Sequence, residues 1–202
     1  MIHSVHSQIE SIIKKKGRGK IIFANDFSPY GTSTAVRHAL SRLCKRGLIL
    51  RLAEGIYVYP KIDKELGLGV LYPSIDTIAK AIARKDKARI APTGLYALNR
   101  LGLSTQVPAN AVFLTDGSPR RIKVGSGKGI LFKHTVPKNL AFKSDMTMLI
   151  VFALKEITKE RVTQEHLDRL QYVLQQTPKD EVLQDTSLMP SWIKNLIIKL
   201  YE

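Results

Sequence analysis

The sequence is poor in residues that build disulfides, cysteine metal sites or membrane spans. It has one cysteine, Cys44, among 202 residues, and a single thiol forms neither an internal disulfide nor a cysteine-based zinc site. The longest apolar run, Met146 to Leu154, is well short of the roughly 20 residues that span a bilayer. The first ten residues lack the basic start and apolar stretch of a secretory signal. We therefore expect a cytoplasmic protein that does not associate with membranes.

Acidic residues are also scarce, since 17 Asp and Glu stand against 32 Lys and Arg, a formal net charge of +15. Residues 1–61 hold 11 basic and 3 acidic residues (net +8), residues 62–145 hold 14 and 6 (net +8), and residues 146–202 hold 7 and 8 (net −1). A basic excess of this size favours a polyanionic partner, either nucleic acid or an acidic protein. A basic protein with a well-solvated surface is the alternative, because net charge is not evidence about fold.

The first third of the chain has the pattern of a winged helix-turn-helix. Apolar residues at helical spacing predict helices over 2–15 and 33–46, with a short strand at 20–23 and a helical turn near 25–31 between them. Thr32 or Ser33 is expected to cap the second helix, and Gly47 to end it. Two β-rich runs, 48–53 and 56–59, flank the dipeptide Glu54-Gly55 and predict a hairpin. A recognition helix followed by a wing has this order of elements.

The remainder predicts a second, α+β domain. Residues 62–72 are interpreted as a linker, followed by helices at 73–84 and 93–101 and a short strand at 88–91. Strands are predicted at 111–115, 121–124 and 130–136, as a small antiparallel sheet, and the last third is helical at 144–157, 163–175 and 190–201. The expected organisation is thus a winged-helix domain (1–61), a linker (62–72) and an α+β domain (73–202).

Several stretches, in two parts of the chain, resemble a known family. Residues 39–47 (ALSRLCKRG) and 52–57 (LAEGIY), with Pro60-Lys61, resemble the N-terminal winged helix of AbiEi-type antitoxins of type IV toxin–antitoxin systems. Residues 94–98 (GLYAL) and 102–108 (GLSTQVP) resemble the start of the second domain in the same group. The resemblance implies a DNA-binding autorepressor that binds its own operator and neutralises a nucleotidyltransferase-like toxin. On this basis the second domain is the antitoxin or effector domain.

The predicted recognition helix supplies most of the candidate DNA-binding residues. Its apolar positions leave the polar and basic residues on the other arc, and residues near the N-terminus of such a helix reach deepest into the major groove. Thr34, Arg37 and His38 are therefore candidates for base edges, with Arg42 and Lys45 better placed for phosphates. The full set of predicted DNA-binding residues is Ser33, Thr34, Arg37, His38, Ser41, Arg42, Lys45, Arg51 and Lys61. A basic, solvated helix face without a ligand is the alternative interpretation.

Two further features bear on binding. Glu54 at the predicted wing tip would repel a phosphate backbone, so deep insertion of that tip is not expected. A second basic group in the middle of the chain is a candidate surface for a partner protein or nucleic acid. Its residues are Arg120, Arg121, Lys123, Lys128 and Lys133.

No catalytic constellation is evident. The histidines are scattered, Cys44 lies on an apolar helical stripe, and no nucleophile, base and orienting group can be assembled. We therefore expect a protein that is not an enzyme and needs no cofactor or metal. Double-stranded operator DNA is the expected partner, and the resemblance implies a cognate nucleotidyltransferase-like toxin as a second partner. A winged-helix regulator with a ligand-binding or dimerisation domain and no toxin partner is the alternative, and an RNA-processing or nucleotide-handling enzyme is a third hypothesis.

Overall fold

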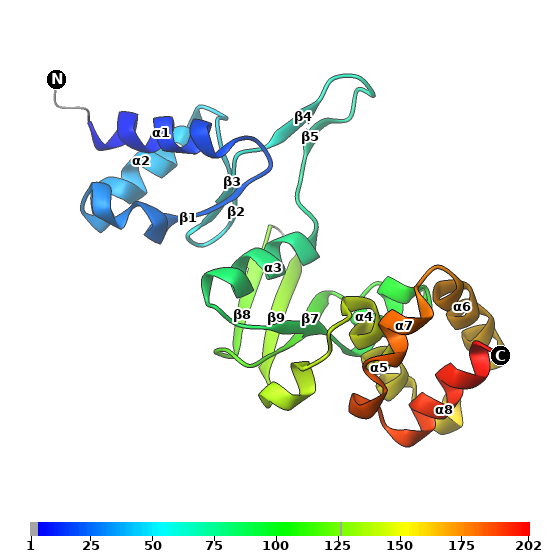
Figure 1. Cartoon of the computed structure of the whole chain (residues 1–202). Coiled ribbons are helices and arrows are strands. Elements are labelled where there is room, and N and C mark those ends of the chain that lie inside the picture. The colour runs from blue at the N-terminus through cyan, green and yellow to red at the C-terminus, as the bar shows by residue number, and fades with distance from the viewer. Residues whose placement is uncertain (1–3, 126) are drawn as a thin grey trace. The chain divides into compact units, whose positions relative to one another are not determined.

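The computed structural model describes residues 4–125 and 127–202, without the side chain of Lys128. The fold is of the α+β class, and the chain divides into two compact units (Figure 1). Unit 1 comprises residues 1–81 with 122–127, and unit 2 comprises residues 82–121 with 128–202. This division differs from the predicted one, because the boundary falls inside a helix at residues 81–82 and unit 1 also takes in a segment far along the chain.

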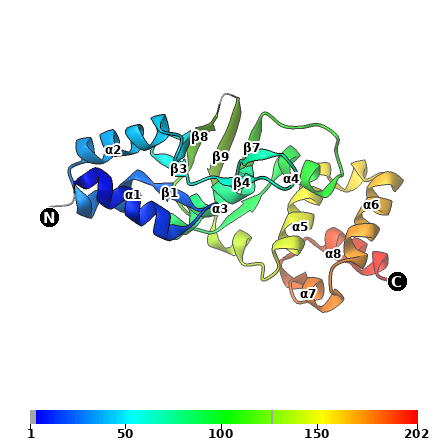
Figure 2. The same ribbon diagram turned by 90° about the horizontal axis from the view of Figure 1, so that it is seen from above.

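Unit 1 packs two helices and a short 3₁₀ helix against a small sheet. Its elements are α1 (Val5–Lys16), β1 (Ile21–Phe23), the 3₁₀ helix η1 (Ala24–Tyr30), α2 (Ser33–Lys45), β2 (Leu50–Ala53), β3 (Ile56–Val58), β4 (Lys61–Asp63), β5 (Gly69–Leu71) and the first part of α3 (Ile75–Lys85). The sheet has the order β1-β3-β2, and both pairings are antiparallel. Seen from above, α1 runs beside α2 (Figure 2). Their apolar faces meet in one core, which includes Ile9, Ile13, Ile22, Phe27, Leu40 and Leu43, each fully buried.

Local sequence explains where α2 begins and ends. The Thr32 hydroxyl accepts a hydrogen bond from the backbone N–H of Ala35 at 3.3 Å, which confirms Thr32 as the N-cap. Gly47 follows the helix in the left-handed region, at φ 71°. The N–H of Gly47 donates to the Cys44 carbonyl and that of Leu48 to the Leu43 carbonyl, at 2.9 and 3.0 Å, a Schellman ending. The bounds of α2 are therefore set by short-range chemistry that the sequence displays.

The segment predicted as a linker is folded. Residues 61–63 and 69–71 pair antiparallel as the two-stranded sheet β4–β5, which leads away from β3 (Figure 1). Each strand has only three residues, too few to show an alternating pattern. Gly67 in the turn and Gly69 at the start of β5, at φ 70° and 66°, adopt left-handed conformations that glycine tolerates. The linker assignment is corrected to a hairpin.

Unit 2 combines a four-stranded sheet with a helical bundle. After the rest of α3 it comprises β6 (Ile90–Pro92), α4 (Gly94–Leu101), β7 (Asn110–Thr115), β8 (Arg120–Val124, of which residues 122–124 belong to unit 1), β9 (Lys128–His134), η2 (Pro137–Leu140), α5 (Asp145–Ile157), η3 (Lys159–Arg161), α6 (Gln164–Gln175), α7 (Lys179–Leu183), η4 (Thr186–Leu188) and α8 (Ser191–Leu200). Helix α5 is buried along most of its length and supplies the centre of the core.

The sheet of unit 2 is mixed, not antiparallel as predicted. Its order is β6-β7-β9-β8, and β7 pairs with β9 in parallel, from Asn110↔Gly129 to Thr115↔His134. The order of the strands follows from which of them is buried. Strand β9 carries Ile130 and Phe132, which are 0% and 3% exposed, whereas β8 carries exposed basic residues. The apolar strand therefore takes the central place and the charged strand the edge.

Candidate nucleic-acid interface

Helix α2 buries one face and exposes two polar stripes. Val36, Ala39, Leu40 and Leu43 are buried in the unit 1 core. Because residues four apart lie on one face of a helix, Ser33, Arg37 and Ser41 form one exposed stripe. A second exposed stripe is made by Thr34, His38, Arg42 and Lys45. All seven α2 residues predicted to bind DNA are thus at the surface.

The first stripe borders a groove of about 480 Å³ in unit 1. Strands β2 and β3 form another wall, to which Arg51 and Tyr57 contribute, and η1 a third, with Asn25 and Ser28. The groove lining also includes Cys44 from α2 and the turn residues Glu54 and Gly55. The fold therefore brings together four predicted residues from two elements, namely Ser33, Arg37, Ser41 and Arg51. The second α2 stripe and Lys61 do not line this groove.

The cations at this face are not neutralised by the protein itself. Within the described part of the chain, no carboxylate lies within 4.0 Å of the side-chain nitrogens of Arg37, Arg42, Lys45 or Arg51. The Nε of Arg42 donates to the His38 carbonyl, and that of Arg51 to the Ala53 carbonyl, both at 3.4 Å. Such bonds orient a guanidinium without cancelling its charge.

Arg46, at the end of α2, has a different environment. Its guanidinium contacts Glu10 of α1 at 2.9 Å and His6 at 3.3 Å. Glu10 also pairs with Lys14 at 2.8 Å. The hydrogen bond from Lys14, followed by that from Arg46, outweighs desolvation and lowers the pKa of Glu10. Arg46 therefore ties α2 to α1.

Cys44 is half-buried where the groove meets the core. Burial raises the pKa of its thiol, an effect that the nearby charge of Arg51 partly offsets. The thiol is therefore protonated at neutral pH and a weak nucleophile. Its place in the lining makes it a natural reporter of what occupies the groove.

Sequence reasoning missed the contribution of η1 to this site. A single helical turn is predicted near residues 25–31, whereas the 3₁₀ helix η1 has seven residues. Asp26 accepts a hydrogen bond from the Phe23 N–H at 3.2 Å, while Phe27 is buried in the core. This anchoring leaves Asn25 and Ser28 facing the groove. Asp26 as a capping residue and Phe27 between polar neighbours were the available signals.

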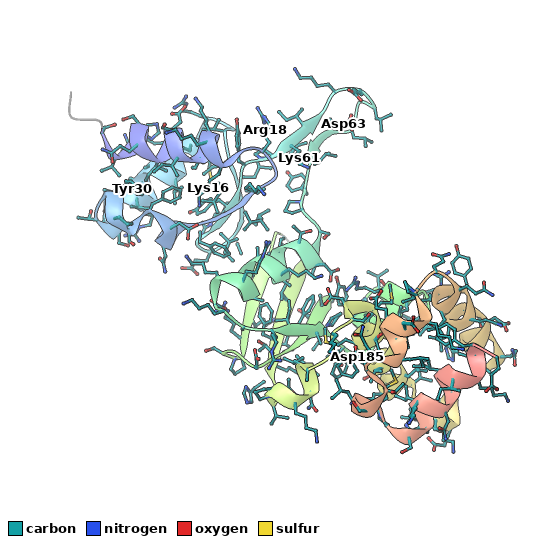
Figure 3. All side chains as sticks on the ribbon, in the orientation of Figure 1. Lys16, Arg18, Tyr30, Lys61, Asp63 and Asp185 are labelled. Carbon is teal, nitrogen blue, oxygen red and sulfur yellow. The ribbon has the colours of Figure 1, made fainter. Side chains whose placement is uncertain are left out.

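Lys61 lies outside the groove, at the start of β4. Its side chain passes close to Gly19, where an added Cβ would clash with it. Nearby, the Arg18 guanidinium donates to the Pro60 carbonyl at 2.9 Å and stacks 4.7 Å from the centre of the Tyr59 ring. Figure 3 shows Arg18 and Lys61 in this region. This basic pair belongs to the base of the β4–β5 hairpin.

The second predicted basic group lies on strands β8 and β9, which are neighbours in one sheet. Arg120, Arg121 and Lys133 belong to unit 2, Lys123 belongs to unit 1, and the side chain of Lys128 lies outside the described residues. Arg120 forms an ion pair with Asp86 and lies 5.9 Å from the centre of the Phe132 ring. Arg121 donates to Asn110 at 3.2 Å. The two arginines thus have structural partners, whereas Lys123 and Lys133 are exposed.

The described residues contain neither a metal-site cluster nor a membrane-spanning helix. No group of three or more His, Cys, Asp or Glu residues in that part of the chain has the arrangement of a metal site. No helix found there is long and apolar enough to cross a membrane.

Comparisons with known proteins identify a family whose function is unknown. No curated protein matches the chain significantly. Among solved structures, the chain is similar to the RV2827C protein from Mycobacterium tuberculosis, with 13% identity, 96% of this chain and 74% of that chain covered, and a TM-score of 0.45. The family of unknown function DUF6088 matches residues 8–182, and the chain belongs to that family.

Proposed function

We propose that unit 1 is a winged helix-turn-helix that binds double-stranded DNA through α2. We further propose that the protein represses its own operon and neutralises a nucleotidyltransferase-like toxin. The observation that carries the first proposal is the exposed face of α2. There Arg37, Arg42 and Lys45 lack a carboxylate partner within the described residues, while neighbouring cations such as Arg46 are paired. Unpaired cations on one helix face suit a polyanion.

The arrangement around α2 supports this proposal. Helices α1 and α2 with η1 precede the antiparallel β2–β3 hairpin, the order of a recognition helix followed by a wing. The groove between α2 and β2–β3 has arginines on both sides, Arg37 and Arg51. A duplex lying along α2 would meet positive charge on the helix and on the hairpin.

The two α2 stripes suggest a division of roles. Arg37 and Thr34 lie in the first half of α2, and Arg37 is not engaged by another described residue. Arginine bonded to guanine is the commonest specific contact in the major groove. Arg42 and Lys45 lie in the last turn, from which a side chain reaches the phosphate backbone. We assign base reading to the beginning of α2 and phosphate binding to its end.

Glu54 limits what the hairpin does. It is exposed at the turn between β2 and β3, and it lines the groove. A carboxylate beside DNA phosphates is repelled, so the turn does not insert deeply. Arg51, within β2, is the hairpin residue proposed to contact the backbone.

The test is the salt dependence of DNA binding by the full chain. Each phosphate contact contributes a slope of about −0.9 in log K against log salt. Contacts by Arg42, Lys45 and Arg51 predict a slope of roughly −3 or steeper on that basis. Fluorescence anisotropy with a labelled duplex measures it. No binding at low salt, or binding independent of salt, overturns the proposal.

The toxin half of the proposal rests on the resemblance of residues 94–98 and 102–108 to AbiEi-type antitoxins. It assigns neutralisation to unit 2. Co-expression of the full chain with the neighbouring gene, scored by growth, tests it. Rescue from toxicity supports the antitoxin function. If the neighbouring gene is not toxic, the antitoxin proposal fails. The alternative is then a winged-helix regulator whose second unit has another role.

A further inference from the structure

The β4–β5 hairpin concentrates exposed apolar side chains. Of the large hydrophobic residues that are exposed in the described chain, more than half lie between residues 62 and 72. Leu66, Tyr72 and Leu68 are 77%, 70% and 64% exposed. The others are Ile62, Val70 and Leu71. Contiguous apolar surface of this kind marks an interaction site.

The pairing of the hairpin sets part of this surface on one face. Ile62 lies opposite Val70 in the antiparallel register, so the two side chains point the same way. Tyr72 directly follows β5 and adds a further exposed apolar side chain. Leu66 and Leu68 lie in the connecting turn, where the Asp63 carboxylate accepts a hydrogen bond from the Leu66 N–H at 2.8 Å. Figure 3 labels Asp63 on this hairpin.

The hairpin also has open edges. The sheet consists of β4 and β5 alone among the described residues, so neither outer edge is paired. A two-stranded hairpin is marginally stable by itself, and open apolar edges are templates for pairing with another chain. Contact with another chain would therefore bury the apolar face and pair the open edges of the hairpin.

Charge identifies the kind of partner. Residues 61–72 contain Lys61, Lys64, Asp63 and Glu65, two positive and two negative charges that balance, in a chain of net charge +15. This balance gives the hairpin no net attraction for a polyanion and no net repulsion of the same hairpin in a second copy. Two copies related by a two-fold axis present the same patch to each other, and the residues alternate in sign closely enough to pair across it.

We propose that the β4–β5 hairpin is a homodimerisation site at which two copies of this chain join through their apolar faces and edges. The inference does not rest on DNA binding. The hairpin supplies 12 residues (61–72) per copy, about half of the roughly 20–30 per side in a standard interface. The dimer is accordingly weak, with a dissociation constant on the order of 1–100 μM.

Salt gives this association a signature opposite to that of DNA binding. The copies repel each other through their large positive charge, and salt screens that repulsion. Apolar contacts do not weaken in moderate salt. Dimerisation therefore strengthens as salt rises, whereas binding to a polyanion weakens.

Sedimentation velocity of the full chain without DNA, over about 1–300 μM and at low and high salt, tests the proposal. We expect a monomer–dimer equilibrium that strengthens with salt. Val70→Lys with Tyr72→Lys should weaken it by roughly tenfold or more. The matched control is Val107→Lys with Val136→Lys, at residues 74% and 55% exposed elsewhere in the chain, and it should leave the equilibrium unchanged. A chain that stays monomeric throughout overturns the proposal, as does equal weakening by both pairs of substitutions.

A second measurement keeps the test independent of hairpin stability. In a Cys44→Ser background, Tyr72→Cys should form an oxidised dimer severalfold faster than Val107→Cys at equal concentration. Equal rates would contradict a hairpin interface even if the lysine variants had misfolded locally. Because neither measurement includes DNA, failure here leaves the DNA-binding proposal standing, and the converse also holds.

Discussion

Three basic residues of α2 and two arginines of unit 2 differ in their partners. In α2, Arg37, Arg42 and Lys45 have no carboxylate within ion-pair distance among the described residues. In unit 2, Arg89 bonds Asp116 at 2.9 Å, and Arg120 pairs with Asp86. Residues 1–61 and 62–145 have the same net charge of +8, so a charge count alone could not distinguish them.

Pairing thus distinguishes basic residues that net charge does not distinguish. A cation already bonded to a carboxylate must lose that bond before it binds a phosphate. Arg89 also donates to the Leu140 and Pro137 carbonyls, both at 3.3 Å, so it joins several segments of unit 2. Arg89 and Arg120 of unit 2 are bonded within the fold, whereas Arg37 and Arg42 of α2 have no carboxylate partner among the described residues.

The largest expected effect tests whether the two units are separate. Leu40 is fully buried in unit 1, and Leu40→Ala should cost about 2–5 kcal/mol of stability there. Trp192 is the single tryptophan and lies in unit 2, packed against its core. Denaturant unfolding followed by circular dichroism should therefore show an early loss of helix, while the tryptophan transition keeps its midpoint. A shift of both signals together would show that the units unfold as one.

The matched experiment in unit 2 uses Ile150→Ala. Ile150 is fully buried in α5, and its truncation should also cost about 2–5 kcal/mol. Here the tryptophan transition is expected to move, and DNA binding at low denaturant should be retained. Loss of DNA binding with unit 1 still folded would contradict the assignment of binding to α2.

The next effect distinguishes two arginines within α2. Arg37→Ala should cost about 1–3 kcal/mol of binding free energy and relax sequence preference at one position. Arg42→Ala should weaken binding to all sequences and reduce the salt slope by about one unit. Competition binding with a randomised duplex library measures both. The control is Lys194→Ala, an exposed lysine in α8. If the two arginine variants behave alike, Arg37 does not read bases.

A smaller effect is expected at Arg120. Its substitution tests directly whether a paired arginine of unit 2 contributes to DNA binding. Arg120→Ala removes its ion pair with Asp86, and a partly exposed pair contributes about 0–1 kcal/mol to stability. Its affinity for DNA should stay within a factor of about two of wild type, which is less than 0.5 kcal/mol. If Arg120→Ala lost as much affinity for DNA as Arg42→Ala does, Arg120 would be part of the binding surface.

The smallest effect is a pH dependence in unit 2. Burial opposes ionisation of Asp116, but hydrogen bonds from the backbone and side chain of Arg89, with its charge, outweigh burial and lower the pKa. A lowered carboxyl pKa contributes stability above the pKa of the unfolded chain, and this is lost as pH falls through the folded value. Unit 2 should therefore lose about 1 kcal/mol or less in acid through this pair. In Asp116→Asn the acid loss should shrink, as followed by Trp192 fluorescence between neutral pH and about pH 3.

Local signals made much of the fold predictable from sequence. The bounds of α2 follow from Thr32 and Gly47, and α1, α4, α5, α6 and α8 follow from apolar residues at helical spacing. The predicted polar arc of α2 is exposed, because the same periodicity defines its buried face. These features depend on neighbours within one or two helical turns.

Features set by distant residues were not predictable. Strands β4 and β5 are three residues long, and the place of β9 beside β7 depends on which strand is buried. The groove includes Asn25 and Ser28 only because η1 packs through Phe27. The ion pairs of Arg120 and Arg46 join residues 34 and 36 positions apart. No local pattern in the sequence indicates such pairs.

The most direct test of the central claim uses Cys44 as a reporter of the groove between α2 and the β2–β3 hairpin. It is the single cysteine and lines that groove beside Arg37 and Ser41. The rate at which a small alkylating reagent modifies it should be measured in the full chain near pH 8, because burial raises its pKa. We predict that saturating duplex DNA at low salt slows the reaction severalfold, and that high salt, which releases the DNA, restores the rate. An unchanged rate with DNA demonstrably bound would show that the duplex lies elsewhere and would contradict the account.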